Sequence, residues 1–137
     1  MADPLTVGLE SYILSVVDQP PRWGENDCVM FVAGWIKIAT GHDPALSYRG
    51  TYRDEASCLE LIARHGGMHS LVASCLKDFR TTYLPRTGDV AVLVLPHRYR
   101  SAFREVMGIR VNGRWAIRGI DGVAFHHLPL LTAWSIV

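Results

Sequence analysis

The chain has 137 residues, of which 49% are hydrophobic and 20% charged, so it is long enough for one domain with a core of its own. This composition excludes a disordered tail and a coiled coil, and we expect a single domain over residues 1–137. The 14 basic and 13 acidic residues leave a net charge of +1, which argues against nucleic-acid binding.

Helical spacing of apolar residues dominates the first half of the chain. The second helix carries an uninterrupted apolar stripe, so we expect it to be central, with Asn26 or Asp27 as its N-cap. Proline and glycine punctuate the segments between helices. We predict a helical part over residues 4–78, with helices at about 4–17, 27–39, from 54 to the glycine pair 66–67, and 69–76.

The pattern changes after Pro85, where short apolar runs alternate with turn residues. The strings VMGIRV and RWAIRG flank Asn112-Gly113, which is typical of a two-residue hairpin turn. The runs GDVAVLVLP, GVAFHHL and TAWSIV predict three more strands. Residues 86–137 should therefore form a small antiparallel sheet that packs on the helices, which gives an α+β fold.

Cys28 is the residue with the clearest chemical potential. A thiol at the start of a helix lies near unpaired N–H groups and the positive end of the helix dipole, which favour the nucleophilic thiolate. The same N–H groups could hold an oxyanion. The alternative is that Cys28 is a small apolar residue of the core stripe.

The three cysteines, at positions 28, 58 and 75, form no CxxC pair, so we expect neither a disulfide framework nor a thiol-rich zinc site. The start MADPLTVGLE lacks the basic residues of a signal peptide, and no apolar run reaches the length of a membrane span. We expect no membrane insertion and a reducing compartment.

The segment RWGENDC (22–28), followed by Phe31-Val32, resembles the nucleophile segment of the NlpC-type papain-like cysteine peptidases of bacterial cell-wall turnover. In that family a Pro-x-x-Gly-Asp turn, matched here by PRTGD (85–89), leads into the first sheet strand. The longer patterns WGENDCVMFVAGW, TGHDPA and YRGTY also resemble small phage-encoded proteins of tail-gene regions, described as tail-assembly or peptidase-like. The resemblance implies a papain-like fold with Cys28 as the candidate nucleophile and Asp27 as the helix cap.

The match departs from an active enzyme at the general base. The family's histidine falls at Val106 in this sequence, and the polar residue that orients it would fall near Ile117 or Arg118. A positioned acid–base group is typically worth ~10²–10⁴-fold in rate, so an amide hydrolase without one should be nearly inert. Three other histidines are candidate replacements for the base: His97, His126 and His127. Each has the alternative of being a surface or structural residue.

Further clusters carry weaker alternatives. The basic loop with Arg98, Arg100 and Arg104 could contact phosphate or an acidic partner, or be a solvated turn. Asp43 and Asp54 resemble carboxylates that order the loop around Arg49 or Arg53. A group of aromatic residues could be a contact surface or core packing: Trp23, Tyr48 and Tyr52. We expect no cofactor, and no metal site, because adjacent histidines on a strand cannot easily share one ion.

The resemblance to phage-encoded proteins, with the missing base at Val106, implies a structural component of a phage tail tip or of its assembly, on a degenerate peptidase scaffold. Its partners would be other tail proteins, such as a hub, tail-fibre or distal tail protein, and peptidoglycan is a further possible contact. The chain would be made in the host cytoplasm and carried in the virion tail. The alternative functions are an active cell-wall cysteine peptidase or amidase and a free cytoplasmic binding domain.

Overall fold

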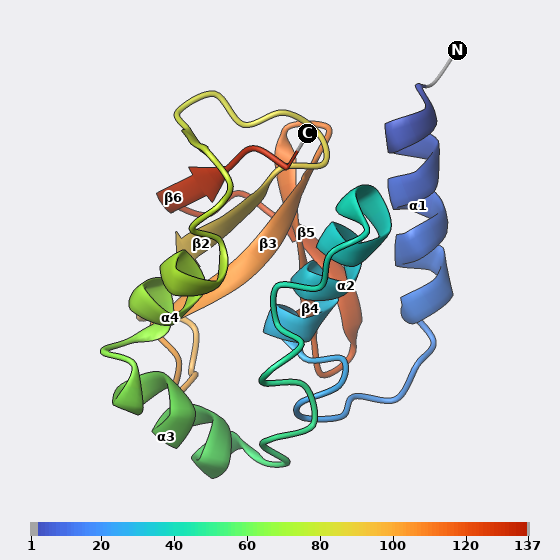
Figure 1. The fold of residues 1–137 in the computed structure, drawn as a ribbon. Coiled ribbons are helices and arrows are strands. Elements are labelled where there is room, and N and C mark those ends of the chain that lie inside the picture. The colour runs from blue at the N-terminus through green and yellow to red at the C-terminus, as the bar shows by residue number, and fades with distance from the viewer. Residues whose placement is uncertain (1–2, 137) are drawn as a thin grey trace.

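The computed structural model describes residues 3–136, in which four helices precede a six-stranded antiparallel sheet (Figure 1). This confirms the predicted α+β class and the order of its two parts. The helices lie within one or two residues of the predicted bounds. They are α1 (Pro4–Val16), α2 (Cys28–Thr40), α3 (Glu55–Arg64) and α4 (Met68–Cys75).

The strands are joined in the order β1-β6-β2-β3-β4-β5, and β3 and β4 form the predicted hairpin at Asn112-Gly113. The sequence missed one strand, because Thr81 and Thr82 pair only with the distant Trp134 and Ala133. The sheet therefore begins before residue 86. Its strands are β1 (Thr81–Thr82), β2 (Val90–Val94), β3 (Glu105–Val111), β4 (Arg114–Gly119), β5 (Gly122–His126) and β6 (Leu130–Trp134).

Local side-chain hydrogen bonds determine where α2 and α3 begin. Asp27 caps α2, and Asn26 instead closes the preceding loop by donating to the carbonyl of Pro20. Gly41 ends α2 with φ of 81°, a left-handed conformation that favours glycine. A capping box between Asp54 and Ser57 starts α3.

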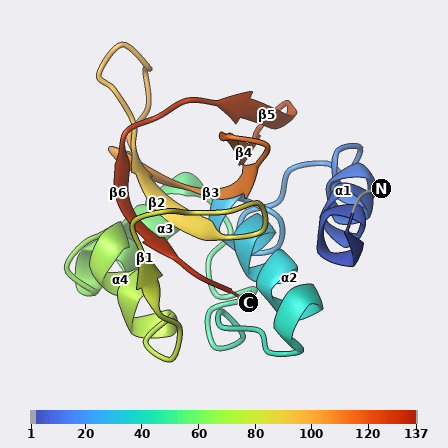
Figure 2. The same cartoon turned by 90° about the horizontal axis from the view of Figure 1, so that it is seen from above.

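The main core lies between α1, α2 and α4 and one face of the sheet (Figure 2). Trp35 of α2 is 1% exposed, and its indole N–H donates to the carbonyl of Gly88, 2.8 Å away, just before β2. Val92 and Ile109 belong to the same core, and both are fully buried. This packing holds the N-terminal end of α2 against β3 and β4, where the candidate nucleophile lies.

A second cluster covers the other face of the sheet, where Trp115 packs with Leu93 and with Leu128 from the connection between β5 and β6. Burial on both faces explains why β2 is a continuous apolar run and not an alternating one. Among residues 3–136, no helix has the length and hydrophobicity required to cross a membrane.

Candidate functional site

Cys28 is the first residue of α2 and lines a pocket of about 410 Å³. The pocket has a helix wall, formed by the start of α2 and the loop before it, and a sheet wall, formed by β3 and β4. We call it the Cys28 pocket. Its lining includes Trp23, Cys58, Phe103, Val106, Ile117 and Arg118.

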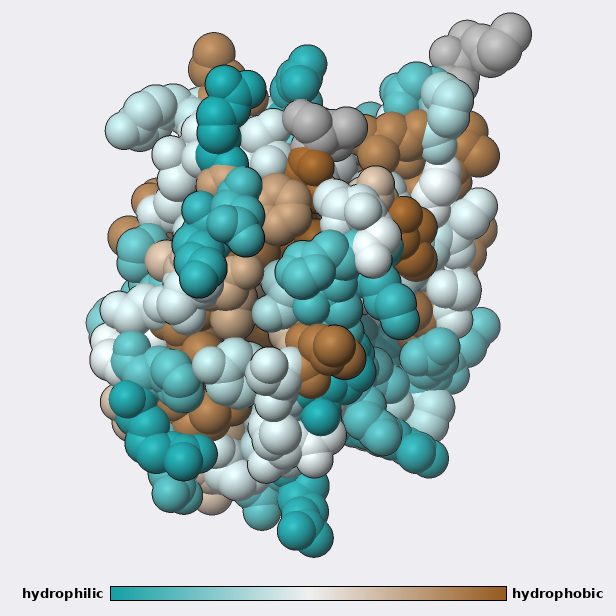
Figure 3. Space-filling view, in the orientation of Figure 1, coloured by the Kyte–Doolittle hydropathy of each residue, from teal (hydrophilic) through white to brown (hydrophobic). Residues whose placement is uncertain are grey.

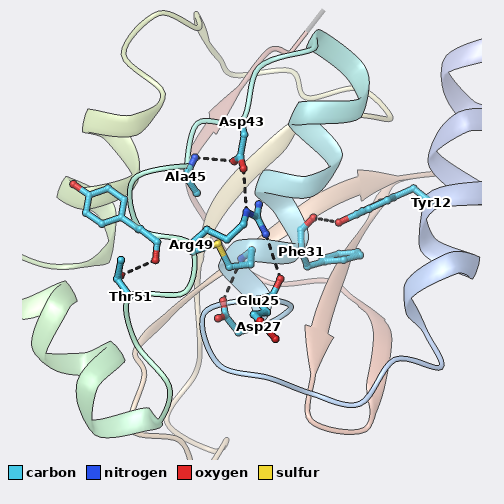
Figure 4. A network of polar contacts seen from close by, with 10 residues as sticks. Tyr12, Glu25, Asp27, Phe31, Asp43, Ala45, Arg49 and Thr51 are labelled. Atoms are coloured by element: carbon cyan, nitrogen blue, oxygen red, sulfur yellow. Dashed lines mark hydrogen bonds and ion pairs between the residues drawn. The ribbon is translucent and has the colours of Figure 1, made fainter.

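The helix wall is built around the carboxylate of Asp27. Its Oδ1 accepts hydrogen bonds from the backbone N–H groups of Val29 (3.0 Å) and Met30 (3.1 Å). Its Oδ2 accepts from the N–H of Gly24 and from the hydroxyl of Tyr52, both at 2.7 Å. One side chain thus caps α2 and ties two loops to it. Figure 4 shows where Asp27 lies in the surrounding polar network. The prediction that Asp27 is the helix cap is confirmed.

Gly24 is required by this arrangement. Its φ is 81°, and a Cβ at this position would lie 2.3 Å from the carbonyl oxygen of Tyr52. Its own carbonyl accepts from the N–H of Gly50 at 2.9 Å. Any side chain would therefore force the two backbone segments apart. This explains the glycine of the segment RWGENDC in terms of packing alone.

The environment of Cys28 keeps its sulfur as a thiol. Burial raises the pKa of Cys28 to about 12, and the negative charge of Asp27 raises it further, while the N–H groups of Met107 and Val29 lower it less. The expectation that the helix terminus favours a thiolate is therefore wrong. The main physical reason is burial, and the cap adds to it, because Asp27 engages the N–H groups of Val29 and Met30 and contributes a negative charge of its own. Those two N–H groups are also not free to hold an oxyanion.

The sheet wall supplies no proton acceptor at the positions where the resemblance implied one. Val106 and Ile117 are aliphatic, partly buried and packed against the cluster around Trp115. Arg118 is 3% exposed and donates to the carbonyls of Val16 (2.8 Å) and Gln19 at the end of α1. Arginine has no acceptor atom, so it could neither take nor orient a proton on an imidazole.

The three candidate histidines lie elsewhere. His97 is exposed, with its Nδ1 3.0 Å from a guanidinium nitrogen of Arg104. The ring of His126, at the end of β5, makes an edge contact with Tyr99 at 6.3 Å between centroids. His127 is exposed and follows β5, so it is not on the strand as predicted. Within residues 3–136, the lining of the Cys28 pocket includes no histidine.

The structure also resolves the weaker candidates. Asp43 holds Arg49 at 3.0 Å as predicted, but Asp54 makes the capping box of α3 and hydrogen-bonds no loop arginine in the described part of the chain. Arg104 folds the basic loop by donating to the carbonyls of Ser101 and Tyr99. The residues that the structure describes contain no cluster of three metal-ligating side chains.

The aromatic residues divide between core and pocket. Tyr52 is 5% exposed and belongs to the core, and Tyr48 makes an edge contact with His65. Trp23 stacks on Phe103 with 6.0 Å between ring centroids, and both rings line the Cys28 pocket. The sequence could not pair Trp23 with Phe103, because 80 residues separate them and neither belongs to a periodic pattern.

Two residues of this site were given no role of their own from the sequence. Cys58 of α3 lines the pocket beside Cys28, and burial raises its pKa to about 12 as well. Arg118 was named only because it falls near the place of the residue that would orient a catalytic histidine. Its hydrogen bonds to the end of α1 were not predicted. Neither residue has a local signal, since both act on segments that are distant in sequence.

The model of a family described as "Domain of unknown function (DUF6950)" matches residues 5–136 of the chain. The match includes all four helices and the whole sheet. No curated protein and no solved structure matches the chain.

Proposed function

The chain belongs to the DUF6950 family, and we propose that it is a structural component of a phage tail tip or of tail assembly. On this proposal its scaffold is a degenerate NlpC-type, papain-like cysteine peptidase domain that serves as a docking module. Its partners are other tail proteins, such as a hub, tail-fibre or distal tail protein. It is made in the host cytoplasm and carried in the virion tail.

The arrangement of elements supports the scaffold. Cys28 opens the helix that packs on an antiparallel sheet, and the Pro-x-x-Gly-Asp turn then leads into β2, in the order that the resemblance implies. Val106 and Ile117, at the positions implied for the base and its orienting partner, line the same pocket as Cys28. This arrangement supports a degenerate site, which would keep the positions of a peptidase site without its chemistry.

The observation that carries the proposal is a partly buried thiol in a pocket whose described lining contains no histidine. With a pKa near 12, a fraction of only about 10⁻⁴ to 10⁻⁵ of Cys28 is thiolate at neutral pH. No residue of the pocket lining in the described chain is a histidine that could remove the proton or return it to a departing amine. These features favour a scaffold over a catalyst.

The mouth of the Cys28 pocket is the surface that we assign to docking. It combines the Trp23–Phe103 stack with Ile120, which is 76% exposed. Aromatic residues of this kind are enriched at the centres of protein interfaces. On the face shown in Figure 3, hydrophobic side chains reach the surface in separate spots among hydrophilic ones.

The test compares assembly with catalysis in one set of phage variants. We expect Cys28→Ser to assemble normal tails, and Ile120→Asp to reduce assembly strongly because it places a charge at the docking surface. Leu46→Asp is the matched control, because Leu46 is 71% exposed and lies away from the Cys28 pocket.

Three results would overturn the proposal: equal assembly by both aspartate variants, absence of the protein from both virions and assembly intermediates, or muropeptide cleavage that Cys28→Ser abolishes. The last result would establish the alternative, an active cell-wall cysteine peptidase or amidase that acts on peptidoglycan during genome delivery. Purified wild-type and Cys28→Ser protein, incubated with muropeptides, are sufficient for that part of the test.

A further inference from the structure

Arg118 is a buried cation whose charge no acidic side chain of the described residues neutralises. It is 3% exposed, and its two terminal nitrogens donate to backbone carbonyls of Val16 and Gln19. Among residues 3–136, the ion pairs involve other arginines, and the Nε of Arg118 is the one buried side-chain nitrogen or oxygen without a hydrogen-bond partner. Burying an unpaired charge is costly, and most such groups have a partner.

Arg118 lines a second cavity, separate from the thiol. This cavity measures about 100 Å³ and lies between α1, α2 and the loop before α2. A water occupies roughly 30 Å³ in the liquid, so the space is sufficient for a phosphate or carboxylate group. Its polar lining consists of Tyr12, Gln19, Glu25, Asn26, Arg49 and Arg118.

A second guanidinium reaches the same cavity from the loop after α2. Arg49 donates from Nε to Asp43 and from Nη1 to the backbone carbonyl of Glu25, at 3.0 and 3.3 Å (Figure 4). Burial raises the pKa of Tyr12 to about 12, and the charges of Arg49 and Arg118 both oppose that shift. The hydroxyl of Tyr12 is therefore within the electrostatic reach of both arginines.

The acidic groups nearby balance only one of the two cations. Asp43 pairs with Arg49. The carboxylate of Glu25 lies 3.6 Å from Arg22, on an exposed surface, and its contact with Arg49 is through the backbone. The carbonyls at the end of α1 contribute partial negative charge to Arg118 but no full counter-charge.

We infer that this cavity binds a small oxyanion, of the phosphate, sulfate or carboxylate class, between the guanidinium groups of Arg118 and Arg49. Guanidinium groups are well suited to such ligands because they donate parallel hydrogen bonds to two oxygens. The bound anion would tie α1, α2 and the loop after α2 together. This inference is independent of the proposed function.

The experiment measures thermal unfolding of the full chain in phosphate, sulfate, acetate or chloride at matched ionic strength and pH. We expect a saturable rise in Tm with phosphate or sulfate, or with acetate if the site prefers carboxylates, and no saturable rise with chloride. A ligand at 100 times its Kd stabilises a protein by about 2.7 kcal/mol, so even a millimolar affinity is measurable. The preferred anion then gives a Kd by calorimetry.

Variants test the site itself. Arg49→Gln should weaken binding of that anion at least tenfold, and Asp43→Asn should leave it unchanged or strengthen it, since it removes a competing carboxylate. Arg118→Gln also removes the anchor of α1, so it is informative only if it remains folded, and Arg49→Gln keeps the test decisive without it. Arg100→Gln, on the exposed basic loop, is the surface control and should bind as wild type.

Three results would overturn the inference. The first is stabilisation by chloride equal to that by every oxyanion, and the second is no stabilisation by any of these anions. The third is a Kd that Arg49→Gln leaves unchanged, which would place the anion elsewhere on the surface.

Discussion

The helix wall of the Cys28 pocket is held by hydrogen bonds from four groups to the carboxylate of Asp27. Val106 and Ile117, on the sheet wall, have only aliphatic side chains, which pack against the cluster around Trp115. The helix wall depends on a carboxylate that is placed to accept four specific hydrogen bonds. The sheet wall depends on apolar packing, which requires only side chains of suitable size. A cysteine hydrolase requires a base within hydrogen-bond reach of its nucleophile, and no histidine of the described residues lines either wall. The cap at Asp27 therefore fixes the position of Cys28, whereas no described residue of the sheet wall activates its thiol.

The largest expected effect concerns the reactivity of Cys28, which the helix wall positions and the sheet wall does not activate. At pH 7.5 we expect iodoacetamide to alkylate Cys28 about 10³-fold more slowly than an ordinary exposed thiol, because a pKa near 12 leaves so little thiolate. The rate should rise about tenfold per pH unit up to pH 10. Peptide mass spectrometry measures it, with the chain in urea as the control. A rate that levels off near pH 8 would contradict the assignment and indicate an activated thiol.

Gly24→Ala tests the most closely packed position of the helix wall. A Cβ 2.3 Å from the carbonyl of Tyr52, at a positive φ, should lower the free energy of unfolding by about 3 kcal/mol or more. Gly8→Ala is the matched control, because Gly8 lies within α1 with open space around its Cα, and this change should stabilise by about 0.5–1 kcal/mol. Urea denaturation measures both. A loss of less than 1 kcal/mol at Gly24 would show that the loop adapts easily.

Asp27→Ala removes the centre of the helix wall. It leaves the N–H groups of Val29, Met30 and Gly24 and the hydroxyl of Tyr52 without their acceptor, which should cost about 2–3 kcal/mol. Asp54→Ala, which removes an exposed cap, should cost only about 1 kcal/mol. Asp27→Ala also removes a negative charge beside Cys28, so the alkylation of Cys28 should become faster. Equal costs at the two caps would mean that the link to Tyr52 contributes no stability.

The same contrast explains how far the sequence predicts this molecule. The helices, the β3–β4 hairpin and the cap at Asp27 follow from periodicity and turn chemistry, which act between residues close in sequence. The strand Thr81–Thr82 was missed because its pairing with β6 spans more than 50 residues and its two residues carry no pattern. Local rules cannot detect an element that exists only through a distant partner.

The candidate site was predictable to the same extent. Cys28 and Asp27 were identified because their roles depend on the start of one helix. The pKa of the thiol was predicted in the wrong direction, because burial depends on tertiary contacts and outweighs the N–H groups of the helix terminus. The hydroxyl of Tyr52, which meets Asp27 across 25 positions of sequence, and the anchoring of α1 by Arg118 had no local signature either.

The smallest expected effect is on the sheet wall. Val106→Ala removes two methyl groups from a partly buried side chain, so it should cost about 1 kcal/mol, whereas Val92→Ala in the fully buried core should cost about 2 kcal/mol or more. Because Val106 exchanges no proton with Cys28, the alkylation rate of the thiol should change by less than about threefold. Urea denaturation and mass spectrometry of the same variant measure both quantities. A tenfold faster alkylation with little loss of stability would mean that Val106 shields the thiol, and the sheet wall would then control its reactivity as closely as the helix wall does.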